Sequence, residues 1–137
     1  MIILDTNILI SALIKDSETR KLIIESGFRF AYPEISLLEI KKYEQYILKK
    51  AGYTETTYKT ILNKLLEYIN LIPLGVIRPE LKKAKEIMEK IDINDIIFIA
   101  AALALDNSII WSNDADFDKQ KAIRALKTKD LLEILEK

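Results

Sequence analysis

Apolar residues follow two different spacings along the chain, and the two spacings alternate. Short segments such as MIIL at residues 1–4 are continuously apolar and stop at a polar residue, which is typical of strands buried on both faces. Longer segments such as TNILISALI at 6–14 carry apolar residues at helical spacing, which is typical of helices with a buried face. The pattern therefore predicts strands that alternate with helices.

Capping and turn residues place the ends of these segments. Asp5 or Thr6 can cap the first helix, and Gly27 and Gly52 can close two later ones. Pro73 indicates an edge strand, because proline has no N–H for a sheet ladder. We predict strands at residues 1–4, 28–33, 71–77, 108–114 and 125–127. We predict helices at residues 6–14, 18–27, 34–52, 56–70, 79–91, 95–106 and 129–137.

This order of elements predicts the fold class. Strands joined through helices need crossover connections, which produce a mainly parallel sheet covered on both faces. The sequence has no internal repeat, low-complexity tract or linker. We therefore expect one α/β domain over residues 1–137, built as a three-layer α/β/α sandwich.

Composition limits the kinds of active site and partner that the chain can have. The chain has 21 basic and 21 acidic residues, so its bulk charge argues neither for nor against a polyanionic partner. It has no cysteine and no histidine, which excludes thiolate chemistry, an imidazole acid or base and the usual zinc site. The longest apolar run, IIFIAAALAL, is about half of the roughly 20 residues that span a bilayer, and no secretion signal is evident. We expect a cytoplasmic protein without a membrane segment.

Four acids are placed to meet at one edge of the predicted sheet. Asp5 ends the first strand, and Asp114 ends a later one, with Asp116 two residues on. Asp95 falls in the first turn of the apolar helix, after a capping Asn94. Open parallel sheets bind ligands beyond the carboxyl ends of their strands, so these side chains are candidates for one site.

Glu39 is a further candidate because of its position on a helix. At 100° per residue it lies on the same face as Ile35 and Tyr43, within the apolar stripe. A carboxylate on such a face is uncommon unless it is paired or holds a cation. A lysine partner would satisfy it equally well.

Each of the other acids also has a plain structural explanation. Asp5 can act only as a helix cap, and Asp95 can favour the positive end of its helix dipole. Asp114, Asp116 and Asp118 can form an ordinary polar turn.

Taken together, the acids point to a metal ion. Two carboxylates about 4 Å apart repel by roughly 4 kcal/mol at an effective dielectric of 20. A group of them needs protonation, lysine partners or a cation, and oxygen-only ligands suit Mg²⁺ or Mn²⁺. Because no histidine can act as a base, water activated by the metal is the natural nucleophile, and the metal also neutralises charge on a phosphate. This chemistry is phosphodiester hydrolysis.

The motifs that carry these acids resemble those of the PIN domain family. They are ILDTNILIS at the start, an acid within SLLEIKKY, NDIIFIAAALAL and WSNDADF, in that order over essentially the whole chain. The resemblance implies an α/β/α sandwich and a small metal-dependent nuclease, and many family members are toxins of VapBC-type toxin–antitoxin pairs. Transferred by position, the catalytic and metal-binding acids are Asp5, Glu39, Asp95 and Asp114.

Other positions match the family pattern less strictly. Asp116 matches an often acidic position and is a further metal ligand. Asn7 matches the small polar residue that commonly follows the first acid, where it orients ligands. Ser112 stands where the family usually has threonine and retains the hydroxyl. Ile96 is bulkier than the residue that often follows the third acid, which changes the shape of the site entrance.

The resemblance implies an Mg²⁺- or Mn²⁺-dependent endoribonuclease that hydrolyses single-stranded RNA. The implied partners are the RNA substrate, an antitoxin protein and a second copy of the chain, with the helices of residues 34–70 as the expected dimer interface. The alternative is a catalytically silent PIN-like module that binds RNA or protein.

Substrate contacts are predicted from charge and aromaticity. The candidate phosphate contacts are Lys41, Lys42, Lys119, Lys121 and Arg124. A solvated charged face explains each of them as well. Tyr43 and Tyr46 can stack bases, whereas Trp111 lies inside an apolar strand and is expected in the core.

Two other α/β folds with acids at strand ends fit less well. A receiver domain needs a phosphoacceptor acid after its third strand, and LIPLGVI has none there. A haloacid-dehalogenase-type phosphatase needs an acid two residues after the first, where this chain has Asn7.

Overall fold

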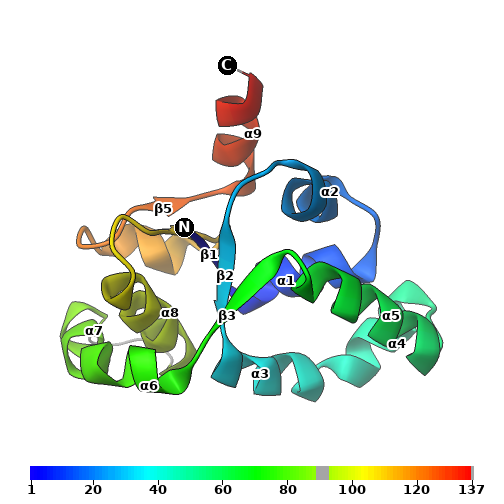
Figure 1. Cartoon of the computed structure of the whole chain (residues 1–137), viewed down its shortest axis with the longest axis horizontal. Helices are drawn as coiled ribbons and strands as arrows, with labels where there is room; N and C mark the ends of the chain where they lie inside the picture. The colour runs from blue at the N-terminus through cyan, green and yellow to red at the C-terminus, as the bar shows by residue number, and fades with distance from the viewer. Residues whose placement is uncertain (89–92, 137) are drawn as a thin grey trace.

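A parallel sheet forms the centre of the molecule (Figure 1). The computed structural model describes residues 1–88 and 93–136. Within these residues the sheet has five strands in the order β3-β2-β1-β4-β5, and every neighbouring pair is parallel. The strands are β1 (Ile2–Leu4), β2 (Phe30–Pro33), β3 (Ile69–Ile72), β4 (Ile109–Trp111) and β5 (Ala125–Leu126).

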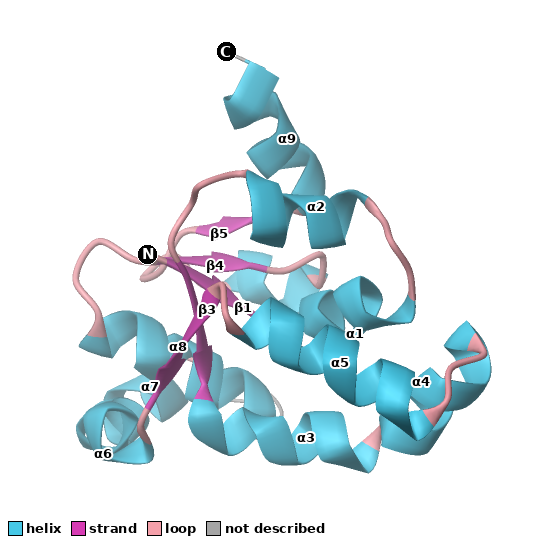
Figure 2. Cartoon of the chain, turned by 45° about the vertical axis from the view of Figure 1, so that its right-hand side comes forward, coloured by secondary structure: helices cyan, strands magenta, loops and turns pink. Residues whose placement is uncertain are grey.

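Helices cover both faces of this sheet. Figures 1 and 2 both place α1, α2, α4 and α5 on one side of the strands and α6, α7 and α8 on the other. The α/β/α sandwich and its parallel sheet are therefore confirmed. The helices are α1 (Thr6–Ile14), α2 (Glu18–Glu25), α3 (Leu37–Lys42), α4 (Glu44–Ala51), α5 (Glu55–Leu66), α6 (Leu74–Ile77), α7 (Leu81–Ile87), α8 (Ile93–Ala104) and α9 (Thr128–Glu136). Short 3₁₀ turns are η1 (Glu34–Ser36), η2 (Arg78–Glu80) and η3 (Ala115–Lys119).

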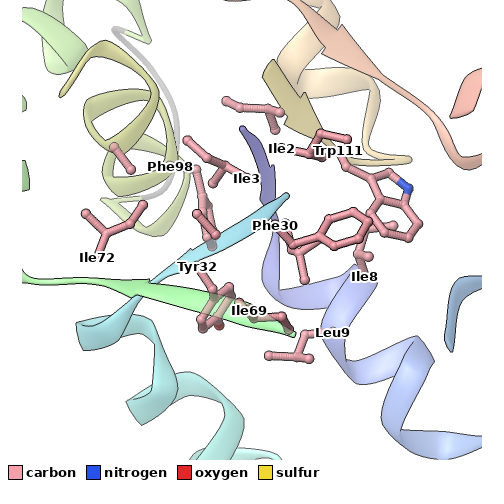
Figure 3. Packing of buried hydrophobic residues seen from close by; sticks show 14 of the residues in the cluster. Ile2, Ile3, Ile8, Leu9, Phe30, Tyr32, Ile69, Ile72, Phe98 and Trp111 are labelled. Atoms are coloured by element: carbon pink, nitrogen blue, oxygen red, sulfur yellow. The ribbon is translucent and has the colours of Figure 1, made fainter. Parts of the chain in front are cut away.

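Aromatic and branched side chains fill the space between the sheet and its helices. Figure 3 shows Phe98 of α8 beside Tyr32, and Trp111 beside Phe30, with ring centroids 5.9 Å and 5.7 Å apart respectively. Trp111 is fully buried, as expected, and its indole N–H donates to the Thr128 hydroxyl at 2.9 Å. A buried indole that keeps a hydrogen-bond partner packs without a desolvation penalty. None of the described helices combines the length and the apolarity needed to cross a membrane.

The third strand differs from the prediction of a strand over residues 71–77. β3 spans Ile69–Ile72, and the chain then turns into α6. Pro73 stands before α6 with φ −63° and ψ 147° and can donate no ladder hydrogen bond, so the strand ends there. The edge position that Pro73 indicated is correct, since β3 is the outermost strand. The helix predicted over 56–70 ends at Leu66, because the apolar residues after it belong to β3.

The helix predicted over residues 34–52 is interrupted. It begins as the turn η1 and breaks between α3 and α4 at Tyr43, whose φ is −95° and ψ is 6°. The Tyr43 N–H donates to the carbonyls of Glu39 and Ile40, both at 3.1 Å, so the bend costs no hydrogen bond. The bend leaves α4 packed on α1. Residues 89–91 of the helix predicted over 79–91 lie outside the described residues, and the described part is η2 followed by α7.

Arg20 anchors the end of α1. Its Nε donates to the carbonyl of Ala12 at 2.8 Å, and its Nη2 donates to the carbonyl of Leu13 at 3.1 Å and to the Tyr53 hydroxyl at 3.2 Å. The last carbonyls of a helix have no partner within the helix, and a guanidinium satisfies them and interacts favourably with the helix dipole. Arg20 therefore fixes α1, the helix that Asp5 caps.

Candidate metal centre

A polar pocket opens at the carboxyl edge of the sheet. The strand order reverses between β1 and β4, and open parallel sheets bind ligands beside such a reversal. The pocket has a volume of 440 Å³. Its acidic lining residues are Asp5, Glu39, Asp95, Asp114 and Asp116, and its other lining residues are Thr6, Asn7, Tyr43, Asn94, Phe98 and Lys119.

Asp5 reaches this pocket because β1 ends at Leu4. Its backbone is extended, and its Oδ1 accepts a hydrogen bond from the Ile8 N–H at 2.8 Å, which caps α1. Its Oδ2 accepts a hydrogen bond from the buried Ser112 hydroxyl. The capping explanation is therefore correct, and the same side chain also lines the pocket. The two donors fix the carboxylate while each oxygen keeps a further lone pair.

Burial dominates the protonation of Asp5. Removal from water raises the pKa of the Asp5 carboxyl above its ordinary value of 3.8. The hydrogen bonds from Ser112 and Ile8 lower this pKa, and the neighbouring charges of Asp114 and Glu39 raise it again. A cation in the pocket would favour the charged form and oppose this shift.

Asp95, Asp114 and Asp116 form a tighter group. Each offers a carboxylate oxygen, and these oxygens all lie within 4.8 Å of one another. Asp114 follows β4, where its N–H donates to the Ser112 hydroxyl at 3.0 Å and its Oδ1 caps η3 through the Asp116 N–H at 2.9 Å. The Lys119 ammonium lies 3.1 Å from Asp116 Oδ1. One lysine therefore offsets part of the negative charge of the group.

Glu39 is held by hydroxyl groups. The Thr6 hydroxyl donates to Glu39 Oε1 at 2.9 Å and lies 2.8 Å from the Tyr32 hydroxyl. Tyr32 in turn donates to the carbonyl of Ser36 at 3.0 Å. Burial raises the pKa of Tyr32, so this hydroxyl stays neutral and able to donate. Among the described residues, no lysine or arginine pairs with Glu39, so the alternative of a lysine partner is not found there, and a hydroxyl group holds the carboxylate.

The structure brings most of the predicted site residues to one place. The five acids and Asn7 line the pocket, Lys119 lines it as well, and Ser112 lies directly behind Asp5. The other predicted phosphate contacts lie outside the pocket lining: they are Lys41, Lys42, Lys121 and Arg124, and all four are exposed.

Sequence reasoning missed three contributions to the pocket. The side chains of Thr6, Asn94 and Phe98 line the pocket. The sequence indicates the first two only as helix caps and Phe98 only as part of a buried helix face. The position of Thr6 directly after the strand-end acid Asp5 could have indicated its role, because from there its hydroxyl reaches Tyr32 on β2. Nothing in the local sequence marks Phe98 as a lining residue, because that depends on where α8 lies against the sheet.

The donor set fits a hard divalent cation. It consists of carboxylate oxygens with no nitrogen or sulfur ligand, which suits Mg²⁺ or Mn²⁺. Two unit charges 4.8 Å apart, the distance within which all these oxygens lie, repel by about 1 kcal/mol in bulk water and about 3.5 kcal/mol at an effective dielectric of 20. A cation removes this repulsion, which Lys119 only partly offsets.

Comparison with known proteins decides the family. A family model described as the PIN domain matches residues 3–134. The chain belongs to the PIN domain family. The resemblance read from the sequence is thereby confirmed. No curated protein matches this PIN domain significantly.

Two solved structures share the fold of this PIN domain. One is a chain in the crystal structure of VapBC2 from Rickettsia felis bound to a DNA fragment from their promoter, with a TM-score of 0.69 and 20% sequence identity. The other is a chain in a toxin–antitoxin complex from Klebsiella pneumoniae, with a TM-score of 0.67 and 18% identity. In both cases the match covers 93% of this chain and 98% of the other.

Proposed function

We propose that this PIN domain is a metal-dependent nuclease that hydrolyses phosphodiester bonds of single-stranded RNA. The observation that carries the proposal is the convergence of Asp95, Asp114 and Asp116 within 4.8 Å in a pocket that Asp5 and Glu39 also line. Such a group of acids is tolerated at low cost when a divalent cation binds between its members. The whole chain would then act as a single nuclease domain.

Each side chain has a proposed role. Asp95, Asp114 and Asp116 hold Mg²⁺ or Mn²⁺, and Asp5 and Glu39 complete the acidic wall. When bound, the ion supplies activation of water and neutralises charge on the phosphate.

The remaining groups position these acids and the substrate. Ser112 and the Ile8 N–H orient Asp5, and the Thr6 hydroxyl orients Glu39. Lys119, at the pocket wall, can leave Asp116 for a substrate phosphate once a cation neutralises the acids. Asn7 is exposed at the same wall and offers an amide to the substrate.

RNA and the protein partners rest on the family. RNA is the substrate that the family resemblance implies, and the two similar structures come from toxin–antitoxin complexes. We therefore propose that the chain is the toxin of such a pair and binds an antitoxin protein. A homodimer through the helices of residues 34–70 is also expected.

The test is cleavage by the purified full chain. The substrates are an end-labelled unstructured RNA, a structured RNA and a DNA strand of the same sequence, each with Mg²⁺, Mn²⁺ or EDTA. We expect cleavage of the unstructured RNA with either metal, loss of cleavage in EDTA and loss in Asp5→Asn. Asp118→Asn is the matched control, because Asp118 lies on the same turn as Asp116 but outside the pocket lining.

Two outcomes would contradict the proposal. Equal cleavage by wild type and Asp5→Asn, or cleavage that EDTA does not reduce, would indicate another mechanism or a contaminant. RNA binding without cleavage under every metal condition would instead indicate a catalytically silent binding module.

A further inference from the structure

A strip of tyrosine and lysine side chains runs along α3 and α4, away from the acidic pocket. It consists of Lys42, Tyr43, Tyr46, Lys49 and Lys50, which we call the tyrosine–lysine strip. On α4, Lys49 and Lys50 lie about 60° and about 40° to either side of Tyr46 in helical direction, because residues three and four apart share a face. Tyr46, Lys49 and Lys50 together line a shallow pocket.

The two tyrosines of the strip are unusually exposed for their type. Tyr43 is 42% exposed and Tyr46 is 54% exposed. By contrast, Tyr32 and Tyr58 are buried, and the Tyr53 hydroxyl is bonded to Arg20 and to the carbonyl of Ile14. The rings of Tyr43 and Tyr46 therefore leave broad apolar faces in contact with water.

The lysines of the strip have no acidic partner within residues 1–88 and 93–136. Among the described residues, Lys42, Lys49 and Lys50 form no ion pair. The nearest acid in sequence, Glu44, lies about 160° around the helix from Tyr46 at 100° per residue. Burial and then the Glu44 charge raise the pKa of Tyr58 on α5, which places that carboxylate toward α5. The strip is therefore a positively charged surface that complements an anion.

Tyr43 connects the strip to the acidic pocket. It lines that pocket together with Glu39, and Tyr46 follows one helical turn later beside Lys49 and Lys50. From Tyr43 to Lys50 the helix rises by about 10 Å, at about 1.5 Å per residue. The strip therefore starts at the wall of the acidic pocket and leads away from it along α4.

Aromatic rings flanked by lysines fit one kind of ligand. Aromatic faces stack on unpaired bases, and lysines beside them pair with the phosphate backbone. A duplex hides its base faces inside the helix, and an acidic peptide would use the lysines but not the rings. The combination therefore fits a single-stranded nucleic acid.

We propose that the tyrosine–lysine strip binds the nucleotides that flank the scissile bond, with bases stacked on Tyr43 and Tyr46 and phosphates paired with Lys42, Lys49 and Lys50. This inference rests on the proposed function, since it extends the path of the same substrate, and it requires that the expected dimer use parts of the helices of residues 34–70 other than the tyrosine–lysine strip. It predicts that affinity for a longer strand depends on α4, well outside the acidic pocket.

Strand binding tests the inference separately from cleavage. Full chains carrying Asp5→Asn are titrated against a fluorescein-labelled, unstructured RNA of about eight nucleotides, a length within usual single-strand site sizes, with fluorescence anisotropy as the readout. We expect Tyr46→Ala to weaken binding about tenfold, whereas Tyr46→Phe, which keeps the ring, should bind like the parent. Tyr68→Ala is the matched control, because Tyr68 is 39% exposed and also lies beside a lysine. Tyr68 directly precedes β3, so it lies at the amino edge of the sheet, opposite the carboxyl edge where the acidic pocket opens.

Salt dependence tests the lysines. Lys49→Ala with Lys50→Ala should reduce the slope of log affinity against log salt by about 1.4, at about 0.7 per phosphate contact on a single strand. The matched pair is Lys21→Ala with Lys129→Ala, on α2 and α9, which lie far from α3 in Figures 1 and 2. These substitutions should leave the slope unchanged.

The outcomes separate this inference from the nuclease proposal. If wild type cleaves RNA but Tyr46→Ala binds RNA with the same affinity as Tyr68→Ala, RNA binding by the strip is refuted and the nuclease proposal stands. If no chain cleaves but Tyr46→Ala alone weakens binding, the strip stands and the nuclease proposal fails. If sedimentation shows that Tyr46→Ala separates a dimer of the parent, the face is an interface between copies and the inference is overturned.

Discussion

Replacing Asp114 with asparagine should make the metal-free chain more stable and the metal-loaded chain less stable than wild type. Asp114 contributes one of three carboxylates within 4.8 Å, so without a cation its charge opposes folding. Asparagine keeps the size of the side chain and an Oδ1 that can accept from the Asp116 N–H. The substitution therefore removes charge with little change in packing.

The size of the effect follows from the separation of the charges. Each of the two repulsive pairs that Asp114 forms costs at least about 1 kcal/mol, which is the value with the full screening of bulk water. Lys119 at 3.1 Å from Asp116 offsets part of this repulsion, so we expect a gain of about 1–2 kcal/mol. With about 2.1 cal/mol/K of unfolding entropy per residue over 137 residues, that gain raises Tm by about 4–7 °C.

Metal binding should act in the opposite direction. A ligand at about 100 times its Kd stabilises the folded state by about 2.7 kcal/mol, or about 9 °C by the same conversion. Wild type should show a shift of this order with saturating Mg²⁺ or Mn²⁺, and Asp114→Asn should lose most of it.

The assay is thermal unfolding at about pH 7, in EDTA and in each metal. Asp118→Asn is the control, since Asp118 lies outside the pocket lining, where it forms an exposed pair with Lys127 at 3.9 Å, and should keep the full metal shift. A lower Tm of Asp114→Asn in EDTA together with an undiminished metal shift would refute the reasoning.

Three further changes test the surroundings of the site. Ser112→Ala removes the donor to Asp5 and should weaken metal binding about 10- to 100-fold by calorimetry, whereas Ser112→Thr should restore it; equal affinity in all three chains would count against an orienting role. Burial raises the pKa of the Asp5 carboxyl above 3.8, so the folded metal-free chain binds the carboxyl proton more tightly than the unfolded chain does. The contribution of Asp5 to stability therefore falls as pH rises from about 4 through the raised pKa. Asp5→Asn should remove this fall, measured as the difference in urea midpoints in EDTA; a difference that is constant with pH would contradict the assignment. Arg20→Ala leaves the last carbonyls of α1 without their donor and should cost about 1–3 kcal/mol in urea unfolding, while Arg29→Ala, at an exposed position, should change stability little.

The fold was predictable where a single local rule decides the structure. Continuous apolar runs predicted β1 and β4, and Pro73 predicted the sheet edge. The bend at Tyr43 was not predictable, because its backbone hydrogen bonds are retained and the bend serves the packing of α4 on α1. The end of α5 at Leu66 was also not predictable, since Ile69 suits either a helix face or a strand.

The site was predictable to a similar extent. Acids at strand ends identified Asp5 and Asp114, because parallel strands bring their carboxyl ends to one edge. The partner of Glu39 was not predictable. Thr6 follows β1 and Glu39 follows β2, and the pairing of these two neighbouring strands leaves no periodic pattern in the sequence. Lys119 was predicted as a phosphate contact, and its pairing with Asp116 becomes visible only when η3 is in place.

The central claim is that acids distant in sequence form one site for a divalent cation. The most direct test is anomalous diffraction from crystals of the full chain grown with Mn²⁺. The account predicts a manganese peak between the carboxylates of Asp95, Asp114 and Asp116, and its absence in Asp114→Asn crystals. A peak elsewhere on the molecule, with none in the acidic pocket, would contradict the account.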